Sequence, residues 1–193
     1  MYVYKQCVTE QSARRQREME AGLLEAMRTK PYDDITISDL CASMNIPRKS
    51  FYRYFDSKED ALHALMDHII MDFSGEVFAD EETATMHTLE RFFQFWIDRR
   101  DFLDALNRSD FGAALVQRCI GKAMEEGTLA KNFLPSSQVD TREYMVSFLI
   151  SGLMSMVLQW HKTGFKANAY QMAQISAQLI TKPLLSVSWA MNN

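Results

Sequence analysis

Glycine and proline are scarce in this sequence, which contains 7 glycines and 4 prolines among 193 residues. No segment of useful length alternates apolar and polar residues as a half-buried strand does. Apolar residues instead recur at helical spacing along nearly the whole chain. These absences argue against a fold of hairpins and tight turns, and the spacing predicts an all-α protein.

Cysteine is also rare, and its placement argues against two kinds of site. Cys7, Cys41 and Cys119 are isolated and odd in number, so the sequence has neither a zinc-ligand spacing nor a disulfide framework. The sequence also lacks a two-histidine-carboxylate spacing, a nucleophile–base pair and a phosphate-binding loop. We therefore expect no metal, no cofactor and no catalytic residue, and a small helical enzyme is the least favoured interpretation.

Long hydrophobic runs are missing as well. The most apolar stretch, Met145–Trp160, is interrupted by Ser147, Ser151, Gly152 and Ser155. It is also shorter than the ~20 residues that a membrane-spanning helix needs. The first residues show no basic region followed by an apolar run, so we expect no signal peptide. The sequence predicts a reduced, cytoplasmic protein without a membrane partner.

The charge of the chain is small but unevenly distributed. Residues 1–60 carry ten lysines and arginines against ten aspartates and glutamates, so the net charge of −4 falls on residues 61–193. Within the first part, basic residues cluster at Arg14–Arg17 and again at Arg48–Arg53. Local basic clusters on an acidic chain indicate a protein that contacts nucleic acid at one end only.

Capping and breaking residues divide the N-terminal part into short helices. Thr36 with Asp39 has the spacing of a capping box, and Ser57 can cap a later helix. Asn45 tolerates the left-handed conformation of a tight turn, and Pro47 suits the first position of a helix. Two short helices joined by a short turn are typical of a helix-turn-helix. The predicted helices are Glu10–Arg28, Ile37–Met44, Pro47–Tyr54 and Lys58–Phe78.

The segment Ile35–Leu65, ITISDLCASMNIPRKSFYRYFDSKEDALHAL, resembles the DNA-binding region of the TetR (tetracycline repressor) family. The aromatic run Phe51–Phe55, followed by Ser57–Glu59 and Leu62, carries the resemblance. It implies a transcriptional regulator, expected to be a repressor, that binds a palindromic operator in double-stranded DNA as a homodimer. It also implies release from DNA by a small-molecule effector, whose identity the sequence does not give.

The resemblance implies which side chains contact DNA. Residues at the leading end of a helix in the major groove meet base edges, and flanking residues meet phosphates. Three positions depart from the family pattern: Asn45 stands where glycine is usual, Pro47 where serine is usual, and Lys49 where glycine is common. Tyr52 and Tyr54 could also be packed surface residues. The expected DNA contacts are Thr36, Ser38, Arg48, Lys49, Ser50, Tyr52, Tyr54 and Lys58.

The spacing of Phe51 and Phe55 predicts that both side chains point inward and hold the short helix onto the rest of the domain. We expect them to pack against Ile35, Leu40 and Leu62. The sequence thus predicts an N-terminal three-helix helix-turn-helix domain over residues 1–57. A C-terminal helical domain for ligand binding and dimerisation is expected over residues 58–193, with residues 58–78 as the connector.

The resemblance is weaker after residue 80, where it points to the subgroup that includes dihydroxyacetone-kinase co-activator-like proteins. Arg99–Leu106, Phe148, Gly152, Trp160 and Gly164 carry it. A co-activator or protein-binding scaffold on the same fold remains an alternative function. The predicted C-terminal helices are Thr85–Leu106, Ser109–Glu126, Asp140–Thr163 and Asn168–Ser188, and Pro183 should kink the last of them.

The C-terminal half offers candidates for a dimer contact and for an effector pocket. In the family the last two long helices pair with those of a second copy, which here implies Tyr144–Trp160 and Tyr170–Leu185. Pockets are mostly apolar, although the same residue types would also make an ordinary core. The candidate pocket residues are Phe92, Trp96, Phe102, Phe111, Met145, Phe148, Leu149 and Trp160.

Overall fold

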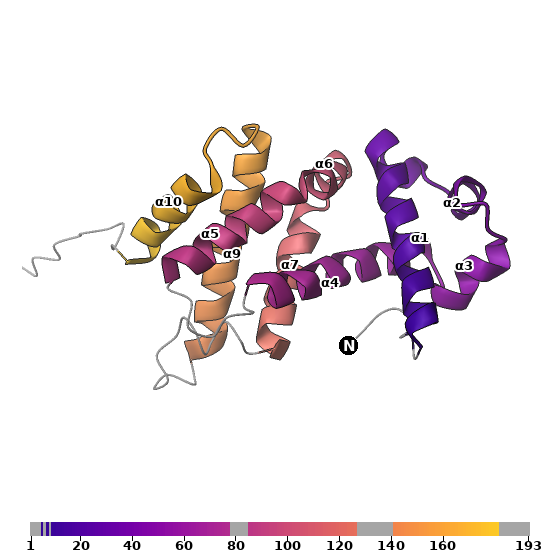
Figure 1. The fold of residues 1–193 in the computed structure, drawn as a ribbon, viewed down its shortest axis with the longest axis horizontal. Helices are drawn as coiled ribbons and strands as arrows, with labels where there is room; N and C mark the ends of the chain where they lie inside the picture. The colour runs from indigo at the N-terminus through magenta and orange to yellow at the C-terminus, as the bar shows by residue number, and fades with distance from the viewer. Residues whose placement is uncertain (1–4, 6, 8, 78–84, 127–140, 182–193) are drawn as a thin grey trace, which may run out of the picture.

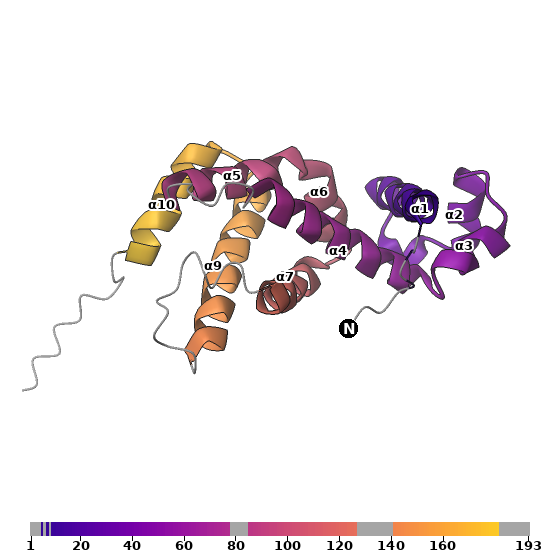
Figure 2. The ribbon, with the colours of Figure 1, turned by 60° about the horizontal axis from the view of Figure 1, so that its bottom comes forward.

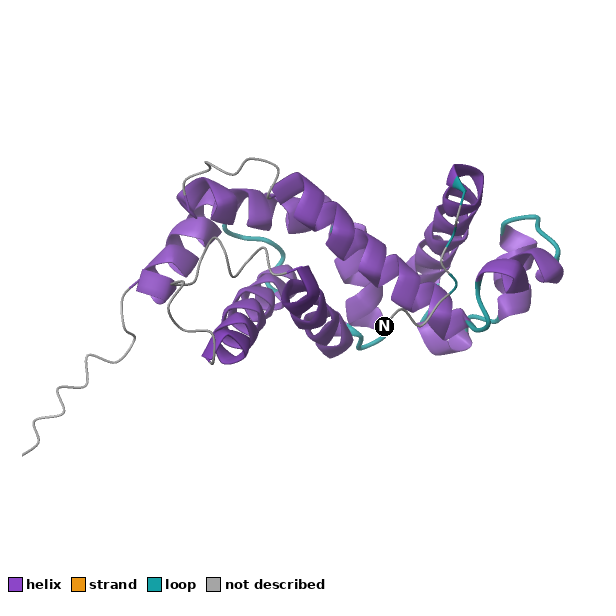
Figure 3. Cartoon of the chain, turned by 90° about the horizontal axis from the view of Figure 1, so that it is seen from below, coloured by secondary structure: helices purple, strands orange, loops and turns teal. Residues whose placement is uncertain are grey.

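The structure, a computed structural model, describes residues 5, 7, 9–77, 85–126 and 141–181. Within these ranges the chain contains helices and loops but no strand (Figure 3), which confirms the predicted all-α class. The elements are α1 (Glu10–Thr29), the 3-10 helix η1 (Tyr32–Asp34), α2 (Ile37–Ser43), α3 (Arg48–Tyr54), α4 (Lys58–Val77), α5 (Thr85–Asp98), α6 (Arg100–Arg108), α7 (Gly112–Glu126), α9 (Arg142–Lys162) and α10 (Ala169–Thr181).

The three N-terminal helices form one end of an elongated molecule (Figure 1). The predicted inward pair, Phe51 and Phe55, is fully buried, and the two ring centroids lie 5.5 Å apart. The expected partners Ile35, Leu40 and Leu62 are buried as well. Burying one large apolar side chain stabilises a fold by ~1.5–3 kcal/mol, so this small cluster can hold α3 against α4.

Helix α4 leads from this end of the molecule to the C-terminal helices (Figures 1 and 2). There α5 packs against α10, and α7 packs against α9. The core of this part is aromatic: the ring of Phe73 on α4 meets those of Phe92 and Trp96 on α5, and Phe93 meets Trp160 on α9. Phe92, Trp96 and Trp160 of this cluster are among the candidate pocket residues.

The predicted single helix Thr85–Leu106 is wrong, because the chain turns at Arg99 and forms two helices. Arg99 has φ −108° and ψ 33°, outside the helical region. Its guanidinium lies 3.5 Å from the centroid of the Phe95 ring and 2.6 Å from a carboxylate oxygen of Glu76. Tertiary contacts with α4 therefore stabilise a break that neither glycine nor proline marks in the sequence.

Smaller differences concern the ends of helices. Pro47 is the residue before α3, with ψ 143°, rather than its first helical residue. The predicted continuations to Phe78 and to Ser188, together with Pro183, lie outside the described residues. Within the described part of the chain, no helix is both long and apolar enough to cross a membrane.

Candidate nucleic-acid interface

Helix α2 begins at a capping box, as the sequence predicts. The Thr36 hydroxyl accepts a hydrogen bond from the Asp39 backbone N–H at 3.1 Å, and the Asp39 carboxylate accepts one from the Thr36 N–H at 3.1 Å. Lys30 donates to the same carboxylate at 3.0 Å. The bonds from Lys30 and then from Thr36 lower the pKa of Asp39 to about 2. This network fixes the start of α2, where Thr36 and Ser38 are exposed.

The turn between α2 and α3 depends on Asn45. Its φ is 53°, the left-handed conformation predicted for this residue. The Ile46 backbone N–H then donates to the Cys41 carbonyl at 2.9 Å, which closes the turn as a Schellman motif. Asparagine therefore serves where the family usually has glycine, and it directs the chain into α3.

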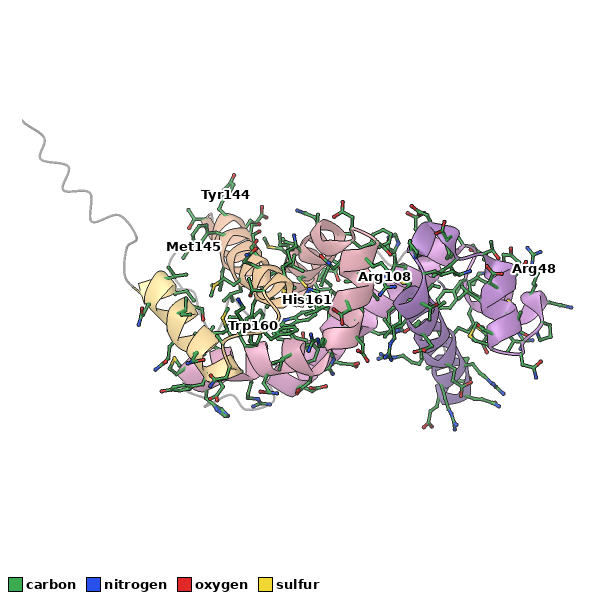
Figure 4. All side chains as sticks on the ribbon, turned by 90° about the horizontal axis from the view of Figure 1, so that it is seen from above. Arg48, Arg108, Tyr144, Met145, Trp160 and His161 are labelled. Carbon is green, nitrogen blue, oxygen red and sulfur yellow. The ribbon has the colours of Figure 1, made fainter. Side chains whose placement is uncertain are left out.

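Helix α3 presents a cationic face with an aromatic ring on it. Arg48, Lys49 and Tyr52 are exposed, whereas Ser50 and Tyr54 are half-buried. Arg48 and Tyr52 lie one helical turn apart, and the guanidinium donates to the Tyr52 hydroxyl at 3.2 Å. Figure 4 shows Arg48 at the end of the molecule that α2 and α3 form. The structure thus brings the expected base-facing residues together on one accessible helix.

The Lys58 ammonium binds backbone carbonyls within the protein, which the sequence did not indicate. Its ammonium donates to the Tyr32 carbonyl at 2.6 Å and to the Ile35 carbonyl at 2.8 Å. It also lies 3.9 Å from the centroid of the Tyr32 ring. Partial burial lowers the pKa of Lys58. An ammonium has three N–H donors, so at most one remains for the expected phosphate contact.

Lys5 is a further cation at this surface, and no motif in the sequence marks it as a site residue. Its ammonium donates to the Tyr52 carbonyl at 3.0 Å and pairs with Asp56 at 2.5 Å. The buried Gln16 side chain donates to the Lys5 carbonyl at 3.4 Å. A cation at the C-terminal end of a helix stabilises it. Only the fold brings Lys5 to α3, because the two lie far apart in sequence.

The candidate pocket residues fall into two groups. Phe92, Trp96, Phe102 and Trp160 are buried, and Phe111, Met145 and Leu149 are partly buried. Trp96 is 1% exposed, and its indole N–H has no hydrogen-bond partner among the described residues. Most buried polar groups are paired, so this N–H is an unusual feature of the interior.

The prediction for Phe148 is wrong, because this side chain is 82% exposed. It points outward because it lies on the exposed side of α9, where it follows Tyr144 at helical spacing and is followed by Gly152 and Ser155. The Tyr144 side chain, which is 77% exposed, also projects from this side of the helix (Figure 4). On α10 the exposed large apolar residues are Tyr170, Ile175, Leu179 and Ile180. We call these residues of the two helices the α9–α10 face.

Comparison with protein families gives two matches. The family described as "Bacterial regulatory proteins, tetR family" matches residues 21–65. The family described as "Transcriptional regulator C-terminal region" matches residues 84–182, which is more than half of the chain. No curated protein matches the chain at a significant level.

Several solved structures share the fold. A TetR transcriptional regulator from Streptococcus agalactiae 2603V is 15% identical, with TM-score 0.64, over 88% of this chain and 95% of the other. The dihydroxyacetone kinase operon activator DhaS is 14% identical, with TM-score 0.56, over 86% and 93%. Thermus thermophilus FadR in complex with lauroyl-CoA is 14% identical, with TM-score 0.52, over 88% and 95%. At these identities the likeness concerns the fold alone.

Proposed function

The chain belongs to the tetR family of bacterial transcriptional regulators, and from this membership we propose that it represses transcription by binding a palindromic operator as a homodimer. Proteins of this family are DNA-binding transcription factors and not enzymes. A small-molecule effector would release the protein from DNA. The observation that carries the proposal is the exposed cationic face of α3, directed outward by the Asn45 turn.

The proposed contacts divide by their role. Arg48, Lys49, Ser50 and Tyr52 would face base edges in the major groove, and arginine or lysine pairs well with guanine. Contacts with phosphate position a protein on DNA without reading sequence. The residues proposed for phosphate are Thr36, Ser38, Tyr54 and the remaining N–H of Lys58.

The α9–α10 face supports the proposed dimer. Gly152 lies on it, and a Cβ atom built there would meet no atom of the described residues within 4 Å. Small residues at this position would let the same helix of a second copy approach closely. Two-fold pairing would place the two copies of α3 about 34–36 Å apart, one turn of the double helix.

The interior of the C-terminal half supports effector binding there. We propose residues 58–193 as the ligand-binding and dimerisation domain and residues 1–57 as the DNA-binding domain. The indole N–H of Trp96, which has no hydrogen-bond partner among the described residues, lies among aromatic rings and could donate to a polar group of an effector. The FadR structure, which is similar in fold, holds lauroyl-CoA, and this likeness supports the proposal of an effector site.

The proposal is tested by footprinting the protein on the DNA upstream of its own gene, followed by fluorescence anisotropy with the protected fragment. We expect a two-fold symmetric protected site, and we expect the doubly substituted protein Arg48→Ala, Lys49→Ala to lose preference for it. A dimeric protein that protects no upstream DNA and enriches no sequence from a random DNA pool would contradict the proposal. That outcome would favour the protein-binding scaffold. Transcription in vitro from the adjoining promoter then distinguishes a repressor from an activator.

A further inference from the structure

Tyr32 lies where the DNA-binding helices meet the C-terminal helices. It belongs to η1, between α1 and α2, and it is 7% exposed. Its backbone N–H donates to the hydroxyl of Ser109 at 3.0 Å, across 77 positions of sequence. The Phe111 ring meets its ring edge-on, with the centroids 5.0 Å apart and the planes at 89°. Two contacts thus join η1 to the turn between α6 and α7.

Lys58, the first residue of α4, contacts both the backbone carbonyl and the ring of Tyr32. The ammonium of Lys58 bonds to the Tyr32 carbonyl and lies over its ring. The same ammonium bonds to the Ile35 carbonyl, at the residue before the Thr36 cap of α2. One tyrosine is therefore held by the start of α4 and by the α6–α7 turn, and it lies four residues from the cap that starts α2.

The turn that holds Tyr32 has a defined conformation. Asp110 has φ 58°, and the Phe111 backbone N–H donates to the Leu106 carbonyl at 2.9 Å, which closes the C-terminal end of α6. Helix α6 lies beside α1 in both views of the ribbon (Figures 1 and 2), and Arg28 on α1 pairs with Asp101 on α6 at 3.2 Å. That exposed ion pair contributes little energy. The contacts of Tyr32, which is itself buried, are better shielded from water than this pair.

We propose that Ser109 and Phe111 are positioning residues for DNA recognition, acting through Tyr32 on the orientation of α2 and α3. We call these three residues with Lys58 the Tyr32 joint. The inference deepens the proposed function, on which its DNA-binding consequence rests. A shift of α6 within the C-terminal helices moves Ser109, and the joint passes that shift to η1 and so to the start of α2.

The test compares Ser109→Ala with Ser109→Thr, because threonine retains the hydroxyl that accepts from Tyr32. Hydrogen exchange of the whole protein, followed by mass spectrometry, reports residues 36–55 separately from α9. We expect exchange of residues 36–55 to accelerate about tenfold in Ser109→Ala, the order of effect of leaving one buried donor unpaired. We expect α9 to be unchanged, and Ser109→Thr to resemble the wild type.

Anisotropy with the footprinted operator and with a scrambled duplex provides the second measurement. We expect Ser109→Ala to weaken operator binding about tenfold while binding to the scrambled duplex is unchanged, since non-specific binding is mainly electrostatic. Equal exchange in the wild type and Ser109→Ala would overturn the inference, as would equal effects of the alanine and threonine variants. Hydrogen exchange needs no operator, so a failure of the proposed DNA-binding function would be recognised separately.

Discussion

Arg48 is the residue on which sequence reading by α3 most depends, because it is exposed at the leading end of the helix and oriented by Tyr52. We expect Arg48→Ala to weaken operator binding by ~1–3 kcal/mol, about 5- to 150-fold, and to relax the base preference at one position per half-site. Anisotropy with a set of single-base operator variants measures both effects.

Arg108 provides the matched control for this prediction. It is an exposed arginine at the end of α6, away from α3 (Figure 4). Arg108→Ala removes the same charge from the chain and should leave the base preference unchanged. Equal losses in the two variants would show that Arg48 contributes only to the general electrostatic attraction.

Asp39 gives the stability of the N-terminal domain a dependence on pH. The bonds from Lys30 and Thr36 lower its pKa to about 2 from the ordinary 3.8. A carboxyl whose pKa is lower in the folded state stabilises the fold above its unfolded pKa, and this contribution is lost as the pH falls toward the folded pKa. We expect the free energy of unfolding of the wild type to exceed that of Asp39→Asn by its full amount at about pH 5. This difference should vanish near pH 2.

Urea unfolding of both proteins across this pH range measures that difference. Lys30→Met, which removes the first of the bonds to Asp39, should reduce the dependence on pH. A difference between the wild type and Asp39→Asn that stays constant from pH 5 to pH 2 would contradict the assignment.

Local signals at single residues could be predicted from the sequence where the cause lies within a few positions. The Thr36–Asp39 cap and the left-handed Asn45 are of this kind, and both are confirmed. The partners of Lys58 and Lys5 could not be predicted, because their contacts join segments 23 to 51 positions apart. The sequence around a lysine at the start of a helix is the same whether the ammonium binds a phosphate or a buried carbonyl.

At the scale of elements, an ion pair between the buried Asp67 and the partly buried Arg118 joins α4 to α7. The Arg118 guanidinium donates to both carboxylate oxygens of Asp67 at 2.7 Å, and the Asp67 side chain is 4% exposed. Breaking such a pair leaves an uncompensated charge in the interior. We expect Arg118→Met to lower the free energy of unfolding by ~3–5 kcal/mol, as measured by urea denaturation.

The double substitution Asp67→Leu, Arg118→Met tests the cause of that loss. Because it removes both charges, it should recover most of the stability. Arg14→Met, which removes an exposed pair with Glu18, should change the free energy of unfolding by less than ~1 kcal/mol. If the double variant were as unstable as Arg118→Met, lost packing rather than the unpaired carboxylate would be the cause.

The helices themselves could be predicted from apolar spacing, but the break between α5 and α6 could not. The pattern continues across Arg99 without a glycine or a proline, and Asp98, although of a residue type that often caps helices, is the last residue of α5. The break depends on contacts that Arg99 makes with Glu76 and Phe95, and these exist only in the folded chain. Such a tertiary contact can override local propensity.

At the scale of the whole molecule, the α9–α10 face predicts the oligomeric state. Phe148→Glu would place a charge within the proposed dimer contact, where burying it would be costly. We expect this variant to be a folded monomer by light scattering, with an unchanged helical circular dichroism spectrum and without operator binding. Gln117→Glu, an exposed position on α7, is the matched control and should remain a dimer. A dimeric Phe148→Glu protein would exclude this face as the interface.

The fold class and the position of the DNA-binding helices could be predicted because caps, turns and aromatic spacing act locally. The lining of an effector pocket could not, because core, pocket and interface use the same large apolar residues. Trp96 and Phe148 illustrate this: both were candidates for the pocket, yet one is 1% and the other 82% exposed. Only the direction of each side chain separates them.

The exposed α9–α10 face also has a consequence for gene dosage. We propose that two chains must associate before either can bind an operator. At total chain concentrations below the dimer dissociation constant, the concentration of the DNA-binding dimer then grows with the square of the chain concentration. Halving synthesis would then reduce it about fourfold rather than twofold. Promoters under such control would switch over a narrow range of protein abundance, and a cell division that divides the chains unequally could by itself turn them on.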